Sequence, residues 1–271
     1  MSARALAVTS LLLLPLVPEL LVAQRGEFDG ARRMLGDPNE FWSPPDYRGN
    51  VSYSGRFTFA RIKYRGYGHF SGREGPGWSH DYPRAETNLM RIMAEVTTMR
   101  PFIESGERVG GVILALDDPE LFRYPVAYLS EPGGWQPTDS EVAGLGQYLQ
   151  KGGFLIVDDF DGWSSDRDLE AFRFHMNRAL PGHRLVPLDG SHPIFDSFFK
   201  VDLTMVRRRQ EPVYYAIFPD NDPTRRIMAI INYNNDIGEW WQWSSRGFAP
   251  IAVSNEAYKL GVNYLIYALT H

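Results

Sequence analysis

Three aspartates that follow a short apolar segment are the first residues whose types and spacing suit chemistry. The apolar run 154–157 lies between a pair of glycines and the acids Asp158, Asp159 and Asp161. A run this short, bounded in this way, is typical of a strand that is buried on both faces, as in a parallel sheet. Open α/β sheets bind ligands just beyond the carboxyl ends of their strands. The aspartates therefore mark a candidate site, or else they cap the next helix and solvate the strand end.

His192 is the histidine best suited to join these acids. Pro193 biases the residue before it toward an extended backbone, which would present the imidazole at a loop near a strand end. There His192 would ligate a metal or act as a base with Asp158 or Asp159. The alternative is a histidine that hydrogen-bonds the backbone and fixes its loop.

A metal site at this edge would draw on an oxygen-rich set with one imidazole, namely Asp158, Asp159, His192 and Asp236. Such a mixture suits Mg, Mn, Ca or Zn without choosing between them. Nothing in the spacing forces these four side chains together, so the sequence leaves open whether a metal binds.

A second polar group lies in the glycine-rich stretch 66–81, which carries His69, His80 and Asp81. Loops at the carboxyl edge of a sheet often carry function. Arg61, in the preceding strand, would point toward the same cleft as a clamp on an anionic substrate. The alternative is a surface loop with Trp78 packed into the core.

Three tryptophans stand close together late in the chain, at Trp240, Trp241 and Trp243. Three indoles at this spacing cannot easily all be buried on one face of a regular element. They would line a sugar-binding platform, dock on a protein partner or lie at a membrane interface, unless they pack in the core. This feature most favours a binding role.

The elements that must position these groups alternate along the chain. Strands are expected at 57–64, 112–116, 125–130, 154–157, 185–188, 214–218 and 227–233, and helices at 85–99, 139–151, 166–180 and 255–269. This alternation predicts a three-layer α/β domain with a mostly parallel sheet.

Composition excludes several classes of function. The net charge of −5 over 271 residues gives no general attraction to nucleic acid. The absence of cysteine excludes disulfides, thiolate metal sites, a cysteine nucleophile and a lipoprotein anchor. The chain has no G-x-G-x-x-G, Walker A or G-x-S-x-G motif, and we expect no cofactor.

The N-terminal residues predict export to the periplasm. A basic start, an apolar run from Ala5 to Val22 and a small residue at Ala23 follow the order of a secretory signal peptide. Leu21 is not the small residue that cleavage prefers, so residues 1–23 are either a removed signal peptide or a retained anchor in the inner membrane. Residues 24–55 are expected to form an extended arm, where Phe41 and Trp42 would hold the arm to the domain or to a partner.

Several weak motifs in a fixed order resemble one family. They are the segments 152–159, 192–195, 234–236 and 260–269, together with Phe59-Ala60-Arg61, Trp78, Asp81 and Asn88-Leu89 upstream. From about residue 56 to the end, the chain resembles the DUF4159 family of exported bacterial proteins, which has no assigned activity. The resemblance implies a flavodoxin-like domain similar to class I glutamine amidotransferases. Those enzymes use a cysteine nucleophile, and since this chain has no cysteine, their chemistry is not carried over.

Two classes of function follow from the sequence. The first is a non-catalytic interaction or structural subunit on the periplasmic side of a membrane-associated assembly, with protein partners. The second is a metal-assisted hydrolase that acts on a glycan or an ester at the strand edge. A carbohydrate-binding module that uses the tryptophans is a further alternative.

Overall fold

The computed structural model describes residues 50–66, 76–104, 108–109, 111–160, 165–207, 210–247 and 250–271. The predicted signal segment, most of the predicted arm with Phe41 and Trp42, and the candidates His69 and Asp161 lie outside these residues. Within them, no helix combines the length and the apolar character needed to cross a membrane.

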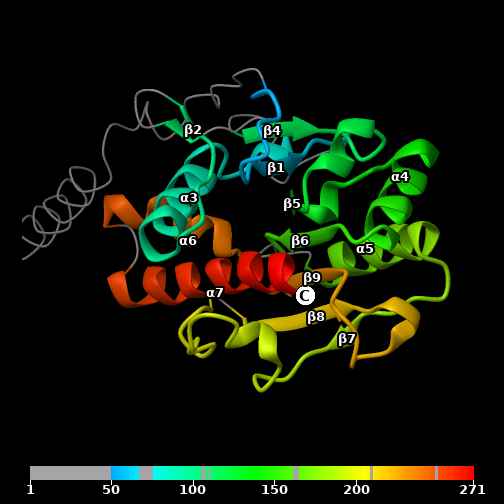
Figure 1. Cartoon of the computed structure of the whole chain (residues 1–271). Helices are drawn as coiled ribbons and strands as arrows, with labels where there is room; N and C mark the ends of the chain where they lie inside the picture. Colours follow the sequence, from blue (N-terminus) through cyan, green and yellow to red (C-terminus); the bar gives the residue numbers. More distant parts are fainter. Residues whose placement is uncertain are drawn as a thin grey trace, which may run out of the picture. The chain divides into compact units, whose positions relative to one another are not determined.

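A mixed sheet forms the centre of the domain (Figure 1). Its strands are β1 (Phe59–Ile62), β4 (Gly111–Leu114), β5 (Val126–Ser130), β6 (Phe154–Asp158), β7 (Val186–Pro187), β8 (Val213–Ile217) and β9 (Ala229–Tyr233). They lie in the order β4-β1-β5-β6-β9-β8-β7. The first five of this order are parallel, whereas β8 runs antiparallel to β9 and β7 antiparallel to β8.

The parallel strands follow a flavodoxin-like order. Numbered along the chain by themselves, β1, β4, β5, β6 and β9 give the spatial order 2-1-3-4-5, which is that of flavodoxin-like sheets. The predicted α/β class with a mostly parallel sheet is confirmed. A separate antiparallel pair, β2 (Ile103–Glu104) and β3 (Arg108–Val109), precedes β4.

Helices cover both faces of the sheet and make the expected three layers. On one face, α4 (Asp139–Gln150) and α5 (Ser165–Ala179) share a core with the strands. On the other face, α3 (Arg84–Val96), α6 (Ile237–Trp243) and α7 (Ile251–Thr270) share a second core (Figure 1). The sheet therefore presents only its edges and strand ends to ligands.

The central strand β6 is apolar from Phe154 to Val157 because its side chains enter the cores on both faces of the sheet. Leu155 and Val157 enter the core on the α4–α5 side, whereas Phe154 and Ile156 enter the core on the opposite side. A strand between two helical layers needs apolar side chains on both faces. Asp158 then ends the strand at the carboxyl edge.

The short helix α6 is the main element that the sequence analysis did not anticipate. It spans seven residues, and the Asp236 carboxylate caps it by accepting a hydrogen bond from the Glu239 N–H. The last helix, α7, also begins earlier than expected, at Ile251 rather than 255. The two late strands expected at 214–218 and 227–233 correspond to β8 and β9, which pair antiparallel.

Replacing Gly144 with alanine should destabilise the domain, although alanine is the better helix former by about 1 kcal/mol. A Cβ at Gly144 would lie 2.2 Å from the carbonyl oxygen of Leu116, a backbone atom with no rotamer to adopt. Overpacking of this kind costs roughly 1–3 kcal/mol, so urea denaturation should show a net loss. Gln147→Ala, at an exposed position of the same helix, is the control and should change stability by no more than about 0.5 kcal/mol. A more stable Gly144→Ala protein would contradict the close contact.

Candidate metal centre

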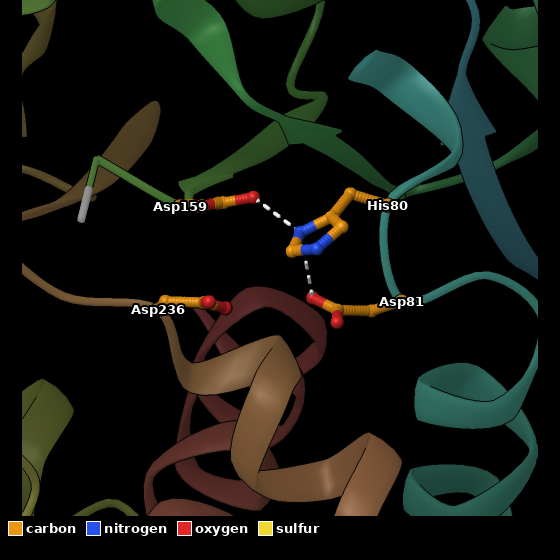
Figure 2. Close-up of side chains that lie close together, drawn as sticks. All are labelled: His80, Asp81, Asp159 and Asp236. Carbon is orange, nitrogen blue, oxygen red and sulfur yellow. Dashed lines mark hydrogen bonds and ion pairs between the residues drawn. The ribbon is translucent and has the colours of Figure 1, made fainter. Parts of the chain in front are cut away.

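Four side chains from three segments converge at the carboxyl edge of the sheet (Figure 2). They are His80, Asp81, Asp159 and Asp236, and one ligand atom from each lies within 4.8 Å of the others. Asp159 follows β6, Asp236 lies between β9 and α6, and His80 and Asp81 lie between β1 and α3. This is the edge at which open parallel sheets bind ligands.

His80 lies between two of the carboxylates. Its Nδ1 is 2.7 Å from Asp159 Oδ2 and 3.7 Å from Asp81 Oδ2 (Figure 2). The Ser130 hydroxyl, at the end of β5, also donates to Asp159 Oδ2 at 3.4 Å. The side chains of His80 and Asp159 are 18% and 9% exposed, so solvent reaches the centre from their side.

Asp81 is the most unusual member of the centre. Its side chain is fully buried, and neither carboxylate oxygen has a hydrogen-bond partner among the described residues. Burial raises the pKa of Asp81 to about 8, opposed by the charge of His80 and reinforced by Glu239 and Asp159. A buried carboxylate without a donor is costly, so this position requires either a proton or a cation.

The backbone adopts uncommon conformations to bring these acids together. Asp81 and Asp159 have φ angles of 64° and 69°, in the left-handed region that is uncommon for residues other than glycine. Such conformations cost of order 1 kcal/mol each and cluster at functional sites. Gly238 permits the close approach of α6, because a Cβ there would lie 2.6 Å from Asp81 Oδ2.

Asp158 does not face the centre as a ligand, contrary to the expectation from the sequence. Its carboxylate accepts hydrogen bonds from the Tyr128 hydroxyl at 2.5 Å and from the Asn232 amide at 3.0 Å. It also accepts from the backbone N–H groups of Ile237 at 3.2 Å and Gly238 at 2.9 Å. Burial raises the pKa of Asp158 to about 6, while these hydrogen bonds act to lower it. Asp158 thus joins β6 to β5, β9 and the start of α6.

Arg61 is not an exposed clamp, because its guanidinium is buried beneath the loop that carries His80. The Nε donates to Glu86 Oε1 at 2.6 Å. One terminal nitrogen donates to the carbonyl oxygens of Trp78 at 3.3 Å and His80 at 3.2 Å. Arg61 is therefore not placed to contact a substrate, as the sequence analysis expected. It instead positions the backbone just before Asp81.

His192 lies away from the aspartates. Its Nδ1 accepts a hydrogen bond from the Ile194 N–H at 3.2 Å, and its ring packs 6.1 Å from that of Tyr267. Tyr267 in turn contacts Phe154, at the start of β6, whereas Asp158 is at its end, about 13 Å further along the strand. The expected grouping of His192 with Asp158 is not formed, and His192 instead fixes its own loop.

The three tryptophans do not form an exposed platform. Trp241 and Trp243 are buried, and Trp240 is partly buried against the second core. The Trp241 indole N–H donates to the Ala257 carbonyl at 2.9 Å, and the Arg84 guanidinium lies 4.8 Å from the centroid of the Trp243 ring. The physical reason is that α6 packs against both α3 and α7, so the helix has two buried sides (Figure 1).

Comparison with family models shows which family the domain belongs to. The model of a domain of unknown function, DUF4159, matches residues 58–269. The chain belongs to the DUF4159 family. The resemblance expected from the sequence is therefore confirmed, and every residue of the candidate centre lies within the DUF4159 match. Comparison with curated proteins gives no match.

Asp81→Asn should change how the stability of the metal-free protein depends on pH. The folded-state pKa of about 8 lies above the unfolded value of about 4, so the native state retains a proton that the unfolded chain releases. Stability due to this group is therefore present below about pH 4 and is lost as pH rises to about 8.

Urea denaturation in EDTA, between about pH 5 and pH 8, should show Asp81→Asn gaining at least about 1 kcal/mol relative to wild type. The exposed Asp196→Asn is the control and should keep a profile parallel to the wild type. A pH-independent difference for Asp81→Asn would contradict a pKa of Asp81 raised by burial.

Proposed function

We propose that this DUF4159 protein is a metal-dependent hydrolase that acts on a glycan or an ester. A divalent ion would be held by His80, Asp81, Asp159 and Asp236. The observation that carries the proposal is the Asp81 carboxylate, which is fully buried and accepts no hydrogen bond from the described residues, while two further carboxylates and an imidazole face it. A bound cation would offset both the burial and the repulsion between these like charges.

The donor set narrows the class of ion. Three carboxylates and one imidazole form an oxygen-rich set that suits Mn²⁺, Mg²⁺ or Zn²⁺ rather than a soft ion such as Cu⁺. The Asp159 carboxylate is hydrogen-bonded to the His80 ring at 2.7 Å, and this contact fixes the orientation of the ring. Arg61 supports the same ring through the His80 carbonyl.

The arrangement supports hydrolysis in particular. A divalent ion supplies an activated water at neutral pH and polarises a carbonyl oxygen. Substrate and water can reach the centre from the side of His80 and Asp159, which are partly exposed. Asp81 and Asp236 are buried, so the centre is closed to solvent on their side. The chain's own contribution is to fix the ligands and to exclude water from behind them.

A non-catalytic subunit of a periplasmic, membrane-associated assembly is the second proposal. An ion at this centre would join the loop before α3, the end of β6 and the start of α6, and such a role could be purely structural. The exposed Ile251 and Phe174 offer apolar surface for a protein partner. The buried tryptophans remove the main support for a carbohydrate-binding module.

Substitution of the proposed ligands should weaken metal binding. We expect Asp81→Asn, Asp159→Asn and Asp236→Asn each to lower the Mn²⁺ affinity measured by calorimetry roughly tenfold or more. His192→Asn is the matched control, because this imidazole packs with Phe218 and Tyr267 instead, and its Mn²⁺ affinity should equal that of wild type. Equal loss in all four variants would contradict the ligand set.

Activity separates the two proposals. The Mn²⁺-loaded full chain should hydrolyse p-nitrophenyl acetate or an acetylated glycan, lose this activity in EDTA and recover it with added Mn²⁺. Metal binding without turnover on any of these substrates, together with a stoichiometric partner from native membranes, would favour the structural subunit. Absence of metal binding would overturn the hydrolase proposal.

A further inference from the structure

A small basic pocket lies between α5 and β8, at the opposite end of the sheet from the metal centre. Four residues with side-chain nitrogens line it, namely Arg173 and Asn177 of α5 and, after that helix, His183 and Arg184. Its apolar wall includes Met176 and Ile217. The cavity measures about 180 Å³. Ile217 pairs with Ala229 at the start of β9, whereas Asp236 of the metal centre follows the end of that strand. The pocket and the metal centre are therefore separate sites.

Two buried nitrogens in this pocket have no hydrogen-bond partner among the described residues. They are Arg173 Nε and His183 Nδ1. Glu170 Oε1 lies 3.6 Å from Arg173 Nε, and the Glu170 side chain is 77% exposed, so this ion pair is weak. A buried donor without an acceptor costs about 1–3 kcal/mol. Arg173 Nε is always a donor, and His183 Nδ1 is a donor in the tautomer that carries its proton there, so the two nitrogens together indicate a site for an acceptor-rich group.

The donors are held in place before any ligand arrives. The Arg173 guanidinium lies 5.4 Å from the centroid of the Tyr215 ring. Asn221 fixes the loop that carries His183, because its Oδ1 accepts from the Arg184 N–H at 2.9 Å and its amide donates to the Gly182 carbonyl at 2.9 Å. Preorganised donors bind an anion without paying the full cost of ordering the loop.

We propose that this pocket binds a phosphate group. Its volume of about 180 Å³ is below the range of roughly 300–1,000 Å³ that drug-sized ligands occupy, so it suits a single group rather than a whole organic ligand. Two arginines, an imidazole and an amide supply donors from several residues, which matches the several acceptor oxygens of a tetrahedral oxyanion. Inorganic phosphate and a phosphate monoester share this chemistry.

Calorimetric titration of the full chain with inorganic phosphate tests the proposal. We expect Arg173→Met and His183→Phe each to weaken binding roughly tenfold, because each removes one buried donor. Arg167→Met is the matched control, since it removes an exposed arginine from the same helix outside the pocket, and it should bind phosphate as wild type does. Circular dichroism and the Tm of each variant exclude loss of folding as the cause.

Further titrations distinguish the sources of the phosphate group. Acetate should bind roughly tenfold more weakly than phosphate, since it offers fewer acceptor oxygens. Tighter binding of glycerol 1-phosphate than of inorganic phosphate would identify a soluble monoester, and recruitment to vesicles that contain phosphatidic acid would identify a lipid headgroup. The proposal is overturned if wild type does not bind phosphate, or if the pocket variants and Arg167→Met bind it equally. None of these outcomes depends on the metal centre.

Discussion

The hydrogen bonds of the Asp158 carboxylate fix the strand ends and the helix start beside the candidate metal centre. Asp158 ends β6 and accepts from Tyr128 of β5, from Asn232 of β9 and from the first turn of α6 at Gly238. Asn232 in turn accepts from the Tyr264 hydroxyl of α7 at 2.7 Å. A buried polar network is stable only when its members are satisfied together. The ends of β5, β6 and β9 and the start of α6 are therefore fixed together, and Asp159 and Asp236 lie directly beside them.

The charges of the centre then determine what it can bind. Without an ion, the raised pKa of Asp81, about 8, means that this carboxyl retains a proton near neutral pH. A divalent ion must displace that proton, so metal binding is coupled to proton release. Arg61 adds to His80 in stabilising charged Asp81, but its guanidinium is engaged by Glu86 and by the loop carbonyls. It therefore cannot move to neutralise the three carboxylates.

Much of the fold could be predicted from the sequence, because short apolar runs between turn residues reveal strands buried on both faces. The same reasoning identified Asp159 and Asp236 at the strand ends and noted His80 and Asp81 in the preceding loop. The sequence alone does not show that these four side chains lie together, because their convergence depends on the spatial order of β1, β6 and β9. The sequence reasoning misplaced His192, because local periodicity does not reveal where the segment after the short edge strand β7 packs. The burial of the tryptophans likewise depends on α6 lying between two helices.

Anomalous diffraction from crystals grown with Mn²⁺ tests the metal centre most directly. Our account predicts one strong peak among His80, Asp81, Asp159 and Asp236, at about 2.0–2.3 Å from the coordinating oxygen and nitrogen atoms. The peak should vanish in Asp81→Asn crystals grown in the same way. A peak at other residues would contradict the metal centre. So would the absence of a peak in wild-type crystals in which Asp81 is still buried and accepts no hydrogen bond.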